Sequence, residues 1–350
     1  MSNWESNIRK VVPYTPGEQP KRKDIIKLNT NENPYPPAPT VRKLLDTLDT
    51  DILRLYPDPC ITDLVEALAK YHGVDSSQVF VGVGSDDVLA MSFMTFFNSD
   101  KPVFFPDITY SFYDVWADLF HIKYDMKPLD DDFKIRKEDY MSENGGIIFP
   151  NPNAPTGVLM DVSDIEEIVK ANQDSVVIID EAYIDFGGVS VLPLVSKYDN
   201  LLVVRTFSKS RSMAGSRIGY AIGDPKLIKY LNDCKYSFNS YTMDSFTIKL
   251  GAASVQDDEY FKETIERIVN TREWTKSELA RLGFVFPDSM SNFVFAKHTK
   301  KPAAELFEKL REKGIFVRYF NKPRIDNYLR ITVGTDEEMK KLIEELEKLC

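Results

Sequence analysis

One lysine stands where the chain changes from an apolar strand to a turn rich in hydroxyl groups. Lys209 comes shortly after the apolar run LLVVRT (201–206) and lies within TFSKSRS. Because a buried ammonium group is costly and its pKa shifts readily, a lysine at the edge of a core is either paired with an acid or used as an amine in chemistry. The position therefore predicts an amine that can act as a nucleophile and move protons.

A carboxylate and a potential anion site accompany this lysine. Asp180 ends the apolar run SVVIID, while Ser208 and Arg217 lie close to Lys209 in the sequence. Ligands of α/β sheets bind at the carboxyl ends of the strands, where both Asp180 and Lys209 are expected. An amine for an aldehyde, an acid for a pyridinium nitrogen and donors for a phosphate are the groups that hold pyridoxal 5′-phosphate.

Several motifs stand in a specific order along the chain. They are NPNAPTG (151–157), DEAY (180–183), TFSK (206–209) and Arg217. In this order and spacing they resemble the fold-type-I aminotransferases. Within that family LRITVGT (329–335) is similar to the histidinol-phosphate aminotransferases, and the likeness extends from PYTPGE and NTNENP near the start to the last helix.

The resemblance implies a pyridoxal-phosphate-dependent enzyme of histidine biosynthesis. Such an enzyme transfers an amino group from histidinol phosphate to 2-oxoglutarate, giving imidazole-acetol phosphate and glutamate, and acts as a homodimer. Two alternatives use nearly the same residues: an aromatic amino-acid aminotransferase and a decarboxylase of a phosphorylated amino acid. A regulatory protein or scaffold that senses the cofactor would need an added DNA-binding segment or a lost lysine, and the sequence shows neither.

The resemblance also assigns catalytic roles to individual residues. Lys209 is the expected Schiff-base lysine, and its amine is the expected general base and acid. Asp180 is expected to pair with the pyridinium nitrogen, and Tyr183 to reach the phenolic oxygen of the cofactor. Tyr110 matches the aromatic residue that stacks on the cofactor ring. Tyr56, in LRLYPDP, matches a tyrosine that reaches the cofactor phosphate of the neighbouring subunit.

A glycine-flanked turn supplies candidates for the phosphate site. In VGVGSDDVL (81–89) the residues Gly84, Ser85 and Asp86 would present backbone amides at the start of a helix, where an anion is favoured. A plain N-cap by Ser85 explains the same pattern almost as well. The resemblance places Ser85 and Asp86 around the phosphate, closed by Ser208 and Arg217.

Three further residues are assigned to the substrate by resemblance. Arg330, in LRITVGT, matches the arginine that binds the substrate carboxylate in a bidentate manner. Arg318 and Tyr14 match residues that approach the phosphate of the substrate, and Tyr236 is a weaker match. A surface arginine or a packing tyrosine is the alternative for each position.

One position departs from the family pattern. The residue before PTG is usually an asparagine that donates a hydrogen bond to the phenolic oxygen of the cofactor, whereas this chain has Ala154. Alanine cannot donate, so no cofactor role is assigned to Ala154. Tyr183 is expected to act alone, or else Asn153 or a water molecule substitutes.

The composition is that of an ordinary enzyme. The 350 residues are 43% hydrophobic, enough for a core, and the formal net charge of −10 contrasts with the basic footprint of a nucleic-acid-binding protein. No apolar run reaches membrane-spanning length and MSNWESNIRK lacks the apolar part of a signal peptide, so we expect a cytoplasmic protein without membrane contact. Cys60, Cys234 and Cys350 lack metal-ligand spacing, which predicts free thiols and no metal site.

Short apolar runs alternate with helical stretches through the middle of the chain. The runs are VFVGV, PVFFP, IKYDMKPL, GGIIFP, SVVIID, LLVVRT and GYAIG. They predict an α/β fold, a fold-type-I transferase whose mainly parallel, seven-stranded sheet is covered by helices on both faces, with a smaller α+β domain.

The chain is expected to divide into three parts. Residues 1–37, rich in proline and asparagine, are expected to form an arm that lies on another surface. Residues 38–256 are the expected large domain, although the helix predicted at 39–48 could also join the small domain. A long helix at 257–282 is expected to lead into that small domain, residues 257–350.

Overall fold

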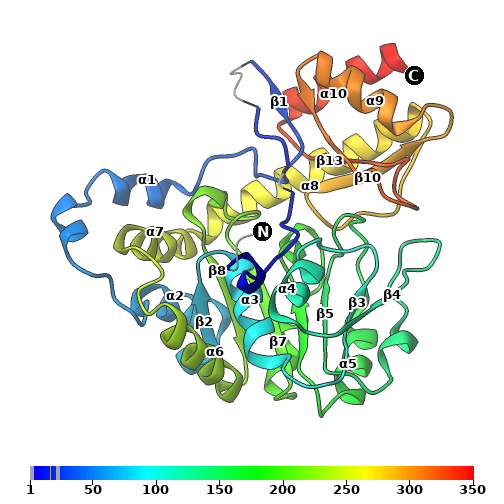
Figure 1. Cartoon of the computed structure of the whole chain (residues 1–350). Coiled ribbons are helices and arrows are strands. Elements are labelled where there is room, and N and C mark those ends of the chain that lie inside the picture. Colours follow the sequence, from blue (N-terminus) through cyan, green and yellow to red (C-terminus); the bar gives the residue numbers. More distant parts are fainter. Residues whose placement is uncertain (1–3, 16, 21–23) are drawn as a thin grey trace.

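A seven-stranded sheet forms the centre of the larger part of the molecule (Figure 1). The computed structural model describes residues 4–15, 17–20 and 24–350, so parts of the predicted arm lie outside the described residues. In spatial order the strands are β2 (Val79–Gly82), β8 (Gly219–Gly223), β7 (Leu201–Thr206), β6 (Val177–Asp180), β5 (Gly146–Pro150), β3 (Val103–Pro106) and β4 (Tyr124–Lys127). All pairs are parallel except those of β8, which confirms the predicted mainly parallel sheet.

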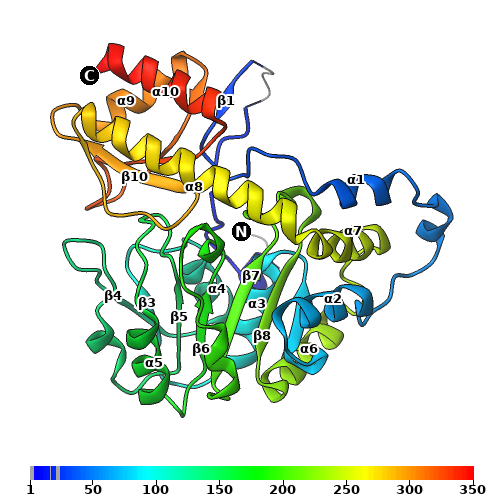
Figure 2. The ribbon, with the colours of Figure 1, turned by 180° about the vertical axis from the view of Figure 1, so that it is seen from behind.

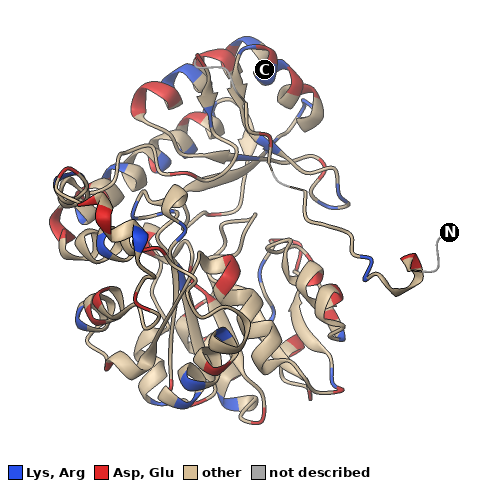
Figure 3. Ribbon diagram, turned by 60° about the vertical axis from the view of Figure 1, so that its left-hand side comes forward, with Lys and Arg blue, Asp and Glu red and all other residues tan. Residues whose placement is uncertain are grey.

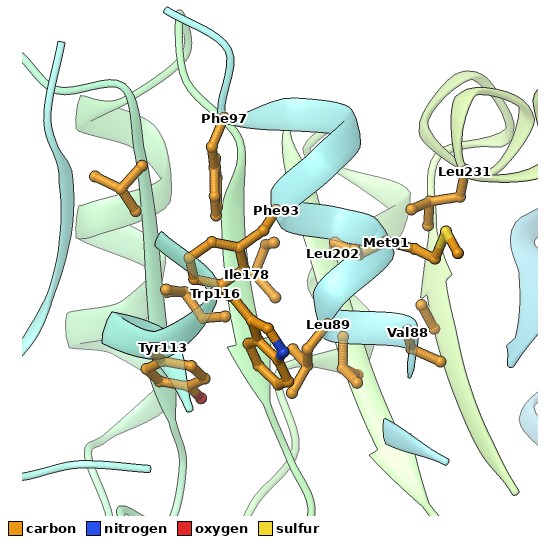
Figure 4. Close-up of a cluster of buried hydrophobic side chains, with 14 of the residues drawn as sticks. Val88, Leu89, Met91, Phe93, Phe97, Tyr113, Trp116, Ile178, Leu202 and Leu231 are labelled. Carbon is orange, nitrogen blue, oxygen red and sulfur yellow. The ribbon is translucent and has the colours of Figure 1, made fainter. Parts of the chain in front are cut away.

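The central strands are buried along their whole length, as strands covered on both faces must be. One face is covered by α3 (Ser85–Phe96), α4 (Tyr113–Phe120) and α6 (Pro225–Phe238). In Figure 4, Phe93 of α3 and Trp116 of α4 meet Ile178 and Leu202 of the sheet. The helices of the opposite face are α1 (Pro39–Leu45), α2 (Thr62–His72), α5 (Val162–Ala171) and α7 (Ser245–Gln256).

A second, smaller unit follows the long helix α8 (Asp258–Arg281), which runs between the two units (Figure 2). Its antiparallel sheet has the order β12 (Arg318–Tyr319), β13 (Leu329–Thr332), β10 (Phe293–His298) and β9 (Phe284–Val285). Helices α9 (Ala303–Glu312) and α10 (Asp336–Leu349) pack on this sheet in one apolar core. The predicted long helix and the predicted α+β character of this unit are thus present.

The N-terminal part of the chain joins both units. Strand β1 (Ile26–Lys27) pairs in parallel with β11 (Ile315–Phe316), so a segment of the predicted arm lies on the smaller unit. Helix α1, by contrast, contacts α7 of the larger unit. In Figure 3 the first described residues project from the rest of the chain. The exact domain boundaries at residues 37 and 256 stay a prediction.

Short 3₁₀ helices fill several connections. They lie at Glu5–Asn7, Thr50–Arg54, Ser76–Gln78, Lys137–Tyr140, Ile184–Phe186, Leu192–Ser196 and Ala214–Ser216.

Within the described ranges no helix has both the length and the apolar composition that crossing a membrane requires, and no cluster of three or more metal-ligating side chains is found. The three cysteines are free thiols. Acidic and basic residues alternate along the helices near the C-terminus (Figure 3).

Candidate active site

Two neighbouring parallel strands bring Asp180 and Lys209 to one edge of the large sheet. Asp180 is the last residue of β6 and lies opposite Val204 of β7, and the chain leaves β7 at Thr206 to reach Lys209. The amine of Lys209 donates a hydrogen bond to the carbonyl oxygen of Thr30 at 3.2 Å. It lines a cavity of about 160 Å³, which is also lined by the predicted residues Tyr14, Tyr110, Tyr183, Arg318 and Arg330.

Asp180 is a buried acid without a cationic partner among the described residues. The hydroxyl of Tyr113 donates to one carboxylate oxygen at 3.2 Å, and the backbone N–H of Ala182 donates to the other at 3.1 Å. Burial nevertheless raises the pKa of Asp180 from 3.8 to about 7, against the effect of these two hydrogen bonds. A protonated ring nitrogen would supply the missing positive charge.

Tyr183 faces the same cavity as Lys209. Its hydroxyl accepts a hydrogen bond from the side-chain amide of Asn31 at 2.9 Å, and its ring packs edge-on against Phe293. The amine of Lys209 lies 5.9 Å from the centroid of the Tyr183 ring. Ala154, also in the cavity wall, belongs to the same apolar cluster as Tyr183. The structure thus brings together the two residues predicted to act on the cofactor's aldehyde and phenolic oxygen.

The five residues predicted to hold the phosphate also gather at one place. Gly84 precedes α3 with φ of +87°, and a Cβ atom there would lie 2.5 Å from a guanidinium nitrogen of Arg217, so this turn requires glycine. Ser85 and Asp86 follow as the first helical residues. The Arg217 guanidinium donates to the hydroxyl of Ser208 at 3.3 Å. The start of a helix beside an arginine suits a phosphate group.

Asp86 and Tyr110 determine the charge next to the residues predicted to hold the phosphate. Asp86 pairs with Arg217 at 3.2 Å and accepts a hydrogen bond of 2.6 Å from the hydroxyl of Tyr110. Burial, together with the negative charge of Asp86, raises the pKa of Tyr110 well above its usual value of 10. Tyr110 therefore stays a neutral donor that links the phosphate site to the cavity of Lys209.

Two arginines stand side by side at the opposite wall of the cavity. Arg318 of β12 pairs across the strands with Arg330 of β13, and neither forms an ion pair with a carboxylate within the described part of the chain. One Arg330 nitrogen donates to the carbonyl of Asn29 at 2.9 Å, whereas its Nε is buried without a partner. Burial and the charge of Arg318 lower the pKa of Arg330. Two guanidinium groups without an acid favour an anionic ligand.

A second cavity adjoins the first. It measures about 550 Å³ and shares Tyr14, Arg318 and Phe320 with the cavity of Lys209. Tyr14 is held there by its ring, which stacks on Phe112 with centroids 4.1 Å apart. Arg318 thus lines both the cavity of Lys209 and a larger space that a substrate can enter, whereas Arg330 lines only the cavity of Lys209.

Tyr56 is not brought to this site by its own chain. Its side chain is 81% exposed and its ring lies 4.7 Å from that of Tyr241. Tyr236, the weaker match, contacts the carbonyl of Pro59 at 3.4 Å and is also exposed. The predicted role of Tyr56 in a neighbouring subunit stays a prediction.

Five residues of the site were outside the predicted set. Asn29, Thr30, Asn31 and Asn33 belong to the NTNENP motif, which marked the resemblance but received no role. The Asn33 side-chain amide donates to the carbonyl oxygens of Lys209 and Ser210 at 3.1 and 3.2 Å. Tyr113, the donor to Asp180, lies in a loop-to-helix stretch with no distinctive sequence signal.

These residues fit pyridoxal 5′-phosphate. The buried carboxyl of Asp180 lacks a cation within the described ranges, and the glycine turn at Gly84 leaves its backbone close to Arg217. Buried side-chain atoms without hydrogen-bond partners border the lysine, namely Oγ1 of Thr30, Oδ1 of Asn29 and Nε of Arg330. Lys209 would hold the aldehyde, Asp180 the ring nitrogen, and Ser208 with Arg217 the phosphate.

Comparisons with known proteins agree with this chemistry. The family model for aminotransferase class I and II matches residues 23–346. The histidinol-phosphate aminotransferase of Lactococcus lactis subsp. cremoris (strain MG1363) is 53% identical over 346 residues, which are 99% of this chain and 97% of the relative. Histidinol-phosphate aminotransferase 1 of Hydrogenovibrio crunogenus (strain DSM 25203 / XCL-2) is 54% identical over 339 residues, or 97% and 95% of the two chains.

A solved structure has the same fold. The histidinol-phosphate aminotransferase from Sinorhizobium meliloti, in complex with pyridoxal-5′-phosphate, superposes with a TM-score of 0.83 and 24% identity. The match covers 93% of this chain and 92% of that one. At this identity the likeness concerns the fold, a large sheet with a smaller appended unit.

Asp180→Asn is expected to make the cofactor-free protein more stable at high pH. Below about pH 4 the carboxyl group of Asp180 is protonated in both the folded and the unfolded protein, and folding buries no charge. Between about pH 4 and 7 only the unfolded protein loses this proton, so the free energy of unfolding falls as the pH rises, and above about 7 the folded protein must hold a buried negative charge. The variant lacks that charge, so its free energy of unfolding should exceed that of the wild type by up to about 4 kcal/mol at pH 8 and by little at pH 4. Urea unfolding of both apoproteins checks this, with Asp174→Asn on the surface as control. An equal difference at both pH values would contradict the prediction.

Borohydride reduction is expected to leave the cofactor on the peptide that contains Lys209. Among the described residues Lys209 is the lysine that lines the cavity, whereas the buried Lys235 donates to the carbonyl of Pro59 at 2.9 Å outside it. Peptide mapping of the reduced protein measures the attachment. Lys235→Ala should keep the label and Lys209→Ala should lose it; recovery of the label on another lysine would show that Lys209 has a different role.

Proposed function

Because this chain belongs to the class I and II aminotransferases, we propose that it transfers an amino group between histidinol phosphate and 2-oxoglutarate in histidine biosynthesis. The observation that carries this proposal is a pair of arginines, Arg318 and Arg330, in the same cavity as Lys209. Neither arginine forms an ion pair with a carboxylate among the described residues. The names of the two relatives at 53% and 54% identity support the same substrate.

Pyridoxal 5′-phosphate supplies the aldehyde that binds amino groups and the ring that accepts electrons. Asp180 keeps a proton on the ring nitrogen, because a buried carboxylate is stable only beside a positive charge. The Lys209 amine, once free, would take the proton from the substrate Cα and deliver it to C4′, the former aldehyde carbon of the cofactor. The amide of Asn33 holds the Lys209 carbonyl and so limits the positions that this amine can reach.

The two half-reactions present different anions to one pair of arginines. Glutamate and 2-oxoglutarate bring carboxylates, whereas histidinol phosphate has no carboxylate and brings a phosphate. Arg330 is fixed by the Asn29 carbonyl and is suited to either group. Arg318 lies one strand further, at the wall shared with the adjoining cavity, and adds the charge that a phosphate dianion requires.

A homodimer is the second part of the proposal. Large apolar side chains are exposed on the segment around Tyr56, at the end of α6 and just after that helix: Leu53, Leu55, Tyr56, Phe238 and Tyr241. Exposed apolar groups of this kind mark protein interfaces. In a symmetric dimer the same segment of each chain faces the other chain, so Tyr56 can complete the phosphate site of its partner.

Arg318→Gln is expected to impair the histidinol-phosphate half-reaction far more than the glutamate half-reaction. Loss of a charge-assisted hydrogen bond costs roughly 1.5–3 kcal/mol, or about ten- to a hundredfold in kcat/KM for the phosphorylated substrate. Single-turnover kinetics of each half-reaction measure the difference. Arg311→Gln, which breaks an exposed pair with Glu18, is the matched control. Equal impairment of both half-reactions, or a wild-type preference for phenylalanine, would favour an aromatic aminotransferase instead.

Mixing Lys209→Ala with Tyr56→Phe subunits is expected to restore activity. If Tyr56 serves the neighbouring site, one of the two sites in each hybrid dimer has both native residues. After random exchange of equal amounts about half of the dimers are hybrids, so about a quarter of all sites should be active. Activity after denaturation and joint refolding is the measurement. Lys209→Ala mixed with Asp180→Asn is the control, because these residues belong to the same chain's site in each subunit. Full activity of Tyr56→Phe alone would remove the support for a shared site.

A further inference from the structure

A short segment, residues 28–33, connects the smaller unit to the catalytic lysine. At its start the N–H of Leu28 donates to the carbonyl of Phe316 at 2.7 Å, and the carbonyl of Leu28 accepts from Thr332 at 3.0 Å. At its end Asn33 donates to the carbonyl of Lys209. Figures 1 and 2 show this part of the chain passing from the smaller unit toward the large sheet. The segment is therefore anchored to both units.

Asn31, in the middle of this segment, is held from several sides. Its side chain is 1% exposed and its φ of +55° lies in the left-handed region, which asparagine tolerates better than most residues. The backbone N–H donates to the hydroxyl oxygen of Thr332 at 3.0 Å, and the backbone carbonyl accepts from Asn292 at 3.0 Å. These contacts fix the position of the Asn31 side chain before any ligand is bound.

The directions of the hydrogen bonds determine what Tyr183 can do. The hydroxyl of Thr332 donates to the side-chain oxygen of Asn31 at 3.0 Å, which leaves the NH₂ group of Asn31 to face Tyr183. An amide NH₂ group only donates. The phenolic oxygen of Tyr183 accepts this hydrogen bond and must direct its own hydrogen elsewhere. The side chain of Tyr183 lines the cavity of Lys209, so the hydrogen is available to an acceptor there.

The residue at position 154 makes this donor more important. Ala154 offers no hydrogen-bond donor, because its side chain is a methyl group buried beside Tyr183. The hydrogen bond to Tyr183 comes instead from Asn31, near the start of the chain. Asn31 belongs to the same segment as Asn33, which donates to the carbonyl of Lys209.

We propose that Asn31 is a positioning residue that makes Tyr183 a hydrogen-bond donor into the cavity, and that Thr332 sets the orientation of Asn31. Thr332 lies two residues after Arg330 on β13. The strand that carries the anion-binding arginine thus also determines the polarity of the hydrogen bonds at Tyr183. This inference rests on the proposed roles of Tyr183 and Lys209.

The pH dependence of the bound cofactor's visible absorbance reports on this hydrogen bond. A donor to the phenolic oxygen stabilises the negative charge left there when the nearby nitrogen of bound Lys209 loses its proton. The donor therefore lowers the pKa of the absorbance change, and its loss raises that pKa. A residue with a purely structural role would alter the stability of the protein but not this pKa.

Asn31→Asp tests the proposal because it keeps the shape of the side chain and replaces the donor by an acceptor. Tyr183 should then donate to the introduced carboxylate instead of into the cavity, and the absorbance pKa should rise by about one unit, as in Tyr183→Phe. In the double variant Asn31→Asp/Tyr183→Phe the two shifts should not add, since both remove the same donor. Additive shifts would mean that the new charge acts directly on the cofactor and would overturn the proposal.

Two further variants separate positioning from folding. Thr332→Val removes the hydroxyl that orients Asn31 while keeping the volume, and should shift the absorbance pKa in the same direction by a smaller amount. Asn200→Asp alters a buried asparagine that donates to the carbonyl of Asn172 at 2.9 Å, away from the site. It should lower the melting temperature and leave the absorbance pKa unchanged.

The outcomes distinguish this inference from the proposed function. A shift in Tyr183→Phe without one in Asn31→Asp or Thr332→Val would overturn the role of Asn31 and leave the site assignment intact. No shift in Tyr183→Phe would overturn both the role of Tyr183 and that of Asn31. Transaminase specificity is measured separately, so failure of the histidinol-phosphate assignment would leave the pKa result valid.

Discussion

The parallel pairing of β6 with β7 is the constraint on which the rest of the site depends. Because the two strands run in the same direction and in register, Asp180 and the turn with Lys209 emerge at the same edge. The antiparallel strand β8 then carries Gly219 against the turn at Gly84, where a Cβ atom on Gly219 would lie 2.2 Å from the backbone. This close approach aligns the start of α3 with Arg217 at that edge. The sheet thus places side by side the residues proposed to bind the cofactor's aldehyde, ring nitrogen and phosphate.

The distribution of charge within the site complements the ligands that it holds. The chain has a formal net charge of −10, yet Arg318 and Arg330 face the cavity without acids among the described residues. On the opposite side Asp180 is an acid without a cation in the described part of the chain. An acid and two arginines left unpaired in this way reduce the stability of the empty protein. The same charges gain favourable partners when the cofactor and an anionic substrate bind.

Much of the fold and part of the site could be predicted from the sequence. Continuous apolar runs identified six of the seven strands, because strands covered on both faces have no polar side, whereas the edge strand β4 was found in the mixed run IKYDMKPL. Asp180 and Lys209 could be found because each follows such a run. Asn31 and Tyr113 could not, since their hydrogen bonds to Tyr183 and Asp180 join residues 152 and 67 positions apart, and no local pattern encodes them. Tyr56 has a predicted role that depends on a second chain, which one chain cannot reveal.

The segment from Leu28 to Asn33 has a consequence for the synthesis of the protein. Its partners in the smaller unit, Phe316 and Thr332, belong to the last part of the chain, and after β13 only α10 follows. During translation the large sheet and Lys209 are therefore made long before the groups that hold Asn31 exist. Contacts between such distant parts form late, once the whole chain is free. The cavity around the lysine is thus completed only in a finished molecule, and a chain that stops before β13 carries Lys209 without the Thr332 hydroxyl that orients Asn31.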